Sequence, residues 1–110
     1  VTLFTDEYRT PLYVSDAVKA IRFLCQNRFT GILHLGGSEK CSRYEFGVEF
    51  ASRNGYENPC INAVTLEKAK LKIYRPPDVS LNSSKAREIL GFRTMSWKQG
   101  IEEYLKSKDA

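Results

Sequence analysis

Residues 75–92 read Arg-Pro-Pro-Asp-Val-Ser-Leu-Asn-Ser-Ser-Lys-Ala-Arg-Glu-Ile-Leu-Gly-Phe, and they are the most informative stretch of the chain. The two prolines fix the backbone and predict a turn, which leads into a short extended run. The Asn-Ser-Ser triplet that follows is a typical helix cap, and Gly91 after Leu90 is a typical helix stop. We therefore expect a turn, an extended segment and a capped helix, in that order.

Composition indicates an ordinary globular domain. Hydrophobic residues make up 42% and charged residues 27% of the 110 residues. No apolar run approaches the ~20 residues that a membrane-spanning helix needs. The net charge of +4 comes from 17 Lys and Arg that are interleaved with 13 Asp and Glu rather than clustered. We therefore expect no nucleic-acid partner and no membrane partner.

The start of the chain and its cysteines favour an intracellular fragment. The chain begins at Val1 without a basic leader or a long apolar segment, so we expect a piece of a longer, cytoplasmic protein. Cys25, Cys41 and Cys60 are odd in number and form no Cys-x-x-Cys pair. This argues against a disulfide framework and against a zinc site. We expect three free thiols and no metal.

Strand and helix patterns alternate in the first half of the chain. Residues 1–5 predict a strand and residues 12–14 a second extended piece. Ser15 is a good N-cap for an amphipathic helix that runs to about Gln26. Its apolar stripe consists of Ala17, Val18, Ile21, Leu24 and Cys25. The glycine-bounded apolar run 31–37 predicts a buried strand.

The second half continues the alternation. Ser42 and Glu45 form a capping box for a helix that stops at Gly55. Residues 61–66 predict a strand, and the charged residues 67–72 predict a loop. A second capping box, Ser96 with Gln99, opens a final helix whose apolar stripe is Trp97, Ile101, Tyr104 and Leu105. We expect an α/β fold with a small mixed or mostly parallel sheet, flanking helices and a frayed C-terminus after Leu105.

Two arginines are the best candidates for ligand contacts. Arg9 lies between the two expected extended pieces, and Arg75 lies at the proline-rich turn. Ligand contacts concentrate on such loops, and a guanidinium can grip a diphosphate through two parallel hydrogen bonds. The structural alternatives are a solvated surface arginine at either position, or an Arg75 that only braces Asp78.

Other patterns that resemble catalytic motifs are better explained structurally. His34 is the only histidine, and without an identified partner we expect it to be buried and hydrogen-bonded. Tyr104 and Lys108 match a Tyr-x-x-x-Lys spacing, yet Tyr104 lies on the apolar stripe and Lys108 at a loose end. The glycine pair at 36–37 lacks the third glycine of a dinucleotide-binding loop. We therefore expect no catalytic, cofactor-binding or metal-binding residue in this chain.

Five segments in the same order resemble the C-terminal part of extended short-chain dehydrogenase/reductases, of the dTDP-4-dehydrorhamnose reductase type. Residues 9–21 resemble an Arg-x-x-x-x-Val-x-Asp-Val-Ala-x-Ala-Ile segment, and residues 31–37 resemble the strand after it. Residues 42–46 resemble a Ser-x-Tyr-Glu-Phe helix start, residues 75–85 an Arg-Pro-x-Asp turn with its helix start, and residues 97–101 a closing Trp-x-x-Gly-Ile helix. The resemblance covers nearly the whole chain. It implies the C-terminal portion of a Rossmann-type fold, without the N-terminal cofactor-binding part.

The resemblance also implies a function. Arg75 matches an arginine that contacts the substrate diphosphate in many nucleotide-sugar enzymes, and Arg9 matches one with a similar role in the epimerase branch. The implied role of residues 1–110, as one domain or fragment, is substrate binding in an NAD(P)-dependent nucleotide-sugar reductase or epimerase. The expected partners are a nucleotide-sugar and the N-terminal Rossmann domain, and a homodimer stays open. NAD(P) would bind the intact protein and not this segment. The alternative is a non-catalytic relative of the kind found as the regulatory subunit of methionine adenosyltransferase.

Overall fold

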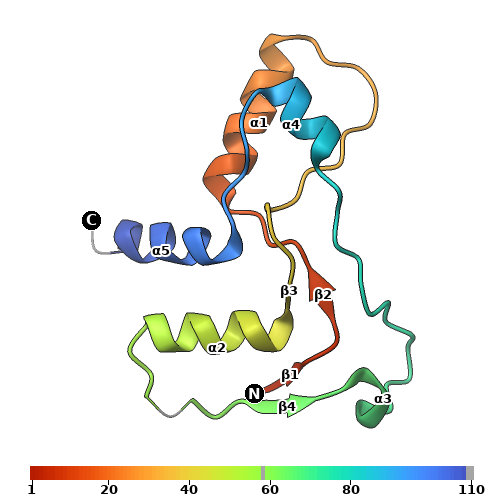
Figure 1. Ribbon diagram of the computed structural model, residues 1–110, viewed down its shortest axis with the longest axis vertical. Coiled ribbons are helices and arrows are strands. Elements are labelled where there is room, and N and C mark those ends of the chain that lie inside the picture. Colours follow the sequence, from red (N-terminus) through yellow and green to blue (C-terminus); the bar gives the residue numbers. More distant parts are fainter. Residues whose placement is uncertain (58, 109–110) are drawn as a thin grey trace.

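Four short strands and five helices make up the described part of the chain. The computed structural model describes residues 1–57 and 59–108. The elements follow one another as β1 (Thr2–Phe4), β2 (Tyr8–Arg9), α1 (Val14–Gln26), β3 (Cys41–Ser42), α2 (Arg43–Arg53), β4 (Asn62–Val64), α3 (Leu66–Ala69), α4 (Ser84–Leu90) and α5 (Trp97–Lys108). Figure 1 shows them spread over a flat molecule of 45 × 38 × 18 Å.

The strands form two separate ladders. β1 pairs in parallel with β4, with Thr2 opposite Asn62. β2 pairs antiparallel with β3, with Arg9 opposite Cys41. The α/β class with a small mixed sheet and flanking helices, expected from the sequence, is thereby confirmed.

Two separate small cores are formed. In the first, α1 packs beside α4 around Ala20, Ala86 and Leu90. In the second, α5 lies alongside α2, where Trp97 and Ile101 are buried with Cys41. The rings of Phe46 and Trp97 have centroids 6.1 Å apart. The β2–β3 ladder lies beside α2 and α5 and below α1 and α4 in the view of Figure 1.

Both predicted capping boxes are formed, whereas Ser83, the N-cap residue of α4, makes no side-chain cap hydrogen bond. In the first capping box, the Ser42 amide donates to Glu45 Oε2 at 2.6 Å and the Glu45 amide donates to Ser42 Oγ at 3.0 Å. The second box joins Ser96 and Gln99 in the same way, with distances of 2.9 and 3.3 Å. Gly91 ends α4 with a φ of 75°, the left-handed conformation that glycine adopts without strain.

Several local expectations are wrong. Residues 12–14 are not a strand, because the pairing falls on Tyr8–Arg9, and α1 begins at Val14 with Tyr13 at its cap position instead of Ser15. Residues 66–69, expected to lead into a loop, form the short helix α3, because Thr65 Oγ1 accepts from the Lys68 amide at 3.2 Å. Lys106–Lys108 are helical rather than frayed, while 109–110 lie outside the described residues.

The apolar run 31–37 is the largest departure from expectation. It forms no strand with any described residue, and His34, expected to be buried, is exposed. Ile32 is 77% exposed. On the nearby helix α1, Val18 and Ile21 of the expected core stripe are each 60% exposed. The radius of gyration is 16.2 Å, against about 13 Å for a compact chain of this length. The apolar residues of the 31–37 run and of the α1 stripe are therefore partly exposed, because the described residues do not cover them.

Gly36 and Gly37 mark the point where chain segments pass closest to one another. The Gly37 amide donates to the Thr10 carbonyl at 3.1 Å, and Thr94 Oγ1 donates to the Gly36 carbonyl at 2.8 Å. A Cβ at Gly37 would collide with the backbone carbonyl oxygen of Pro11. This glycine pair is thus explained by close packing.

Within the described residues, no helix has the length and apolarity to cross a membrane.

Replacing Gly37 by Ala should lower the free energy of unfolding by roughly 1–3 kcal/mol, because a backbone carbonyl cannot move aside for the methyl group. Gly47→Ala is the matched control. There the new methyl meets only the end of the flexible Leu3 side chain, and alanine favours the helix. Urea denaturation of both variants tests this, and equal midpoints would contradict it.

Candidate anion-binding site around Glu7

Backbone pairing places the start of α2 against the segment that precedes β2. Because β2 and β3 are adjacent strands, the Arg43 amide donates to the Glu7 carbonyl at 3.1 Å. Arg43 is the first residue of α2, and the Ser42 capping box fixes the direction in which that helix leaves β3. The backbone of Arg43 is therefore held beside Glu7 from both sides.

The proline-rich turn is attached to the other side of β2. The Tyr8 amide donates to the Pro77 carbonyl at 2.7 Å, and the Val79 amide donates to the Tyr8 carbonyl at 3.3 Å. Tyr8 and Asp78 thereby form an isolated parallel bridge. This pairing brings Arg75 next to a segment that lies far from it in the sequence.

Three arginine side chains close over the carboxylate of Glu7, which is fully buried at 0% exposure. Arg9 Nη2 lies 2.6 Å from Glu7 Oε1. Arg43 Nε lies 3.2 Å and Arg75 Nη1 3.7 Å from Glu7 Oε2. A buried carboxylate without a counter-charge would be strongly unfavourable, and the guanidinium groups supply that counter-charge. Three positive charges against one negative leave a surplus of two positive charges.

The three guanidinium groups differ in how many of their donors are used. Arg9 donates to the Tyr8 carbonyl at 2.8 Å and to Glu7 at 2.6 Å. Among the described residues, the side chains of Arg43 and Arg75 donate no hydrogen bond, and Glu7 Oε2 accepts none. Arg43 and Arg75 are 50% and 43% exposed. Their N–H groups can therefore be offered to an anion.

The cluster borders two hollows. Arg9 and Arg43 line a cavity of about 300 Å³ whose walls are mostly apolar and include Leu3 and Phe46. Arg75 lines a different cavity of about 470 Å³. Arg43 from the first cavity and Arg75 from the second both approach Oε2 of Glu7, which is buried and lines neither cavity.

Arg75 contacts Glu7, whereas Asp78 of the same turn is held by other residues. The Ser80 amide donates to Asp78 Oδ1 at 2.9 Å, and Lys40 Nζ donates to Oδ2 at 2.9 Å. Hydrogen bonds from Ser80, with a smaller contribution from Lys40, hold the pKa of Asp78 well below its usual value. The alternative in which Arg75 only braces Asp78 finds no ion pair here, since the contact of Arg75 is with Glu7.

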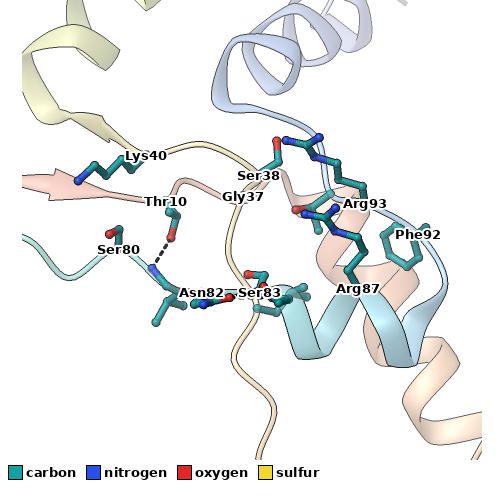
Figure 2. Close-up of a pocket in the computed structure, with 14 residues that line it drawn as sticks. Thr10, Gly37, Ser38, Lys40, Ser80, Asn82, Ser83, Arg87, Phe92 and Arg93 are labelled. Atoms are coloured by element: carbon teal, nitrogen blue, oxygen red, sulfur yellow. Dashed lines mark hydrogen bonds between the residues drawn. The ribbon is translucent and has the colours of Figure 1, made fainter.

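A third cavity, of about 270 Å³ and more polar than the other two, lies where α4 approaches the loop after residue 37. Figure 2 shows the side chains of Arg87 and Arg93 extending toward Ser38, with Asn82 and Ser83 below them. Both arginines are exposed. The sequence pointed to neither of them.

Of the residues singled out from the sequence, Arg9 and Arg75 are brought together on one carboxylate. Glu7 and Arg43 were missed. The capping box at Ser42 gave a signal for Arg43, because the residue after an N-cap has a fixed place at the helix start.

Tyr104 packs against Phe50, with ring centroids 5.8 Å apart, and is 42% exposed. Within the described part of the chain, no group of three His, Cys, Asp or Glu side chains could hold a metal ion.

Comparison with known proteins agrees with this architecture. The family model described as RmlD substrate binding domain matches residues 1–109. The chain belongs to this family. A relative, the spore coat polysaccharide biosynthesis protein SpsK of Bacillus subtilis (strain 168), is 32% identical over 106 residues, which is 96% of this chain and 36% of SpsK.

Solved structures share the fold of this family member. The dTDP-4-dehydrorhamnose reductase of Bacillus anthracis str. Ames, in complex with NADP, superposes with a TM-score of 0.87 at 21% identity, over 97% of this chain and 38% of that protein. The dTDP-4-dehydrorhamnose reductase of Clostridium acetobutylicum ATCC 824 gives 0.86 at 22% identity, over 100% of this chain and 39% of that protein. The chain therefore spans well under half the length of these proteins.

The three cysteines are free thiols in the structure, with Cys25 and Cys60 exposed and Cys41 buried. Burial raises the pKa of Cys41 to about 11. At pH 8 its thiolate would be roughly 1 in 1,000 of the thiol.

Iodoacetamide at pH 8 should therefore modify Cys25 and Cys60 quickly and Cys41 only slowly. In urea all three should react. Mass spectrometry of the native chain, alkylated without reductant, checks this. A Cys41–Cys60 crosslink in fresh protein, or equal rates at all three thiols, would contradict it.

Proposed function

We propose that this chain is the substrate-binding region of an NAD(P)-dependent nucleotide-sugar reductase or epimerase of the dTDP-4-dehydrorhamnose reductase type. The observation that carries the proposal is the convergence of Arg9 and Arg75 on the buried carboxylate of Glu7. The surplus of positive charge matches the doubly charged diphosphate of a nucleotide-sugar. Membership of a substrate-binding family supports the same reading.

In this proposal Arg75 makes the main contact with the diphosphate. Its guanidinium is half exposed and spends none of its donors on hydrogen bonds to the described residues. A guanidinium can bind two phosphate oxygens at once, which lysine cannot do. Arg9 adds positive charge and its remaining donors, although two N–H groups are already engaged. We therefore expect Arg9 to contribute less than Arg75.

The chemical step is proposed to belong to the rest of the protein. The chain covers 36% of SpsK and 38% of the reductase solved with NADP, so the relatives have room for a further domain. We propose that such a domain binds NAD(P) and carries the residues that transfer hydride and proton. A cytoplasmic location is part of the same proposal.

A binding-only relative is the second candidate. The described residues contain a charged cluster suited to binding, and the one Tyr-x-x-x-Lys match has its tyrosine packed against Phe50. Such a site would serve a regulatory subunit as well as an enzyme. An assay of the full-length protein for nucleotide-sugar-dependent oxidation of NADPH distinguishes the two, because only the enzyme turns over.

In the full-length protein, Arg75→Ala should weaken nucleotide-sugar binding by roughly 1.5–3 kcal/mol, the usual value of a hydrogen bond to a charged group. Calorimetric titration with a dTDP-sugar measures this, and the affinity for NADP(H) should hardly change. Arg53→Ala, which removes an arginine paired with Glu49 at 2.9 Å, is the control. An unchanged dissociation constant with a lower melting temperature would leave Arg75 a structural role only.

The 110-residue chain by itself should bind NADH and NADPH no better than millimolar, because it carries no complete glycine-rich dinucleotide loop. A fluorescence titration with each nucleotide tests this. Saturable binding in the micromolar range would mean that this segment holds a cofactor site of its own.

A further inference from the structure

The cluster at Glu7 contains more positive charge than a buried carboxylate requires. Arg9 alone forms a close, hydrogen-bonded ion pair with Oε1 at 2.6 Å. Arg43 and Arg75 add two further guanidinium groups at 3.2 and 3.7 Å from Oε2, without a hydrogen bond to it. Burying a carboxylate is favourable only with good pairing, but one well-placed guanidinium supplies that. The other two need a different explanation.

From this arrangement we infer that Arg43 is a third ligand of the diphosphate, and that Glu7 is the positioning residue that orients Arg43 and Arg75 toward it. The inference rests on the proposed function and extends it to two residues outside the predicted pair. Arg43 approaches Glu7 with its Nε, its side chain is 50% exposed, and its outer nitrogens donate no hydrogen bond to the described residues. Two guanidinium groups that share one carboxylate can bind neighbouring phosphate oxygens.

The backbone supports the positioning role. The backbone of Arg43 is held by the hydrogen bond that its amide donates to the Glu7 carbonyl, at 3.1 Å, and by the capping box at the start of α2. The turn that carries Arg75 is held by the hydrogen bond that the Tyr8 amide donates to the Pro77 carbonyl, at 2.7 Å. Both attachments are to β2 and the residue before it. Glu7 therefore sets the distance between two guanidinium groups that come from separate parts of the sequence.

A positioning role and a simple charge effect predict opposite results for one substitution. Glu7→Gln removes a negative charge and leaves three arginines. If only charge mattered, an anion would bind more tightly. If Glu7 orients the arginines, the anion should bind more weakly, because misplaced donors lose their geometry.

The test uses the full-length protein and calorimetric titration with thymidine, dTMP, dTDP and inorganic pyrophosphate. Arg43→Ala should weaken dTDP and pyrophosphate binding by about tenfold or more, the loss expected for one charge-assisted hydrogen bond. Thymidine binding should be unaffected. Arg53→Ala, the same change at the other end of α2, should alter binding less than about twofold, as surface charges usually do.

Glu7→Gln should weaken dTDP binding severalfold, and Arg43→Ala should cost less in that background than in the wild type, since the two residues act together. Glu7→Asp keeps the charge, withdraws the carboxylate by one methylene and should also weaken binding. The Glu7→Asp variant replaces Glu7→Gln in the test if Glu7→Gln does not fold, which melting temperatures will show. Tighter binding by a folded Glu7→Gln variant, or equal effects of Arg43→Ala and Arg53→Ala, would overturn the inference.

The failure of the proposed function would look different. If the wild-type protein binds pyrophosphate but not dTDP, and Arg43→Ala abolishes that binding, the nucleotide-sugar function falls while the diphosphate cluster stands. If dTDP binds and Arg75→Ala alone weakens it, the function stands and the role of Arg43 falls. If neither probe binds, both are wrong.

Discussion

The buried carboxylate of Glu7 is the constraint on which the arrangement of the site depends. It is fully buried, and three arginines from three parts of the chain surround it. Arg9 comes from β2 itself, Arg43 from the start of α2, and Arg75 from the proline-rich turn. One carboxylate is therefore the common contact of segments that lie far apart in the sequence.

The two cores explain why the charged cluster lies where it does. α1 with α4 and α2 with α5 bury their own apolar residues in two separate cores of a molecule only 18 Å thick. Around β2 the segments are joined by a short ladder and single backbone hydrogen bonds. A region with few apolar contacts can hold polar groups without displacing core residues. The cluster thus occupies the part of the fold where burial is supplied by guanidinium groups rather than by hydrocarbon.

Local rules in the sequence predicted local structure well. The capping boxes at Ser42 and Ser96 and the stop at Gly91 are formed, because each depends on residues within a few positions of one another. The run 31–37 failed for the opposite reason. Its apolar residues indicate burial, but only Leu33 and Leu35 find a partner surface among the described residues, on the core of Ala20, Ala86 and Leu90, while Ile32 is 77% exposed. Periodicity reports which face is apolar and does not report what covers it.

The site itself shows the same division between local and distant information. Arg9 and Arg75 stood out because a resemblance and an unusual turn marked them, whereas Glu7 looked like any surface acid in a polar segment. Its burial arises from the pairing of Tyr8 with both β3 and the turn at Pro77, contacts that span most of the chain. A residue that holds others in place can be identified only from its contacts with them, and these others lie far away in the sequence. Such a residue can be recognised only once the fold has brought those residues together.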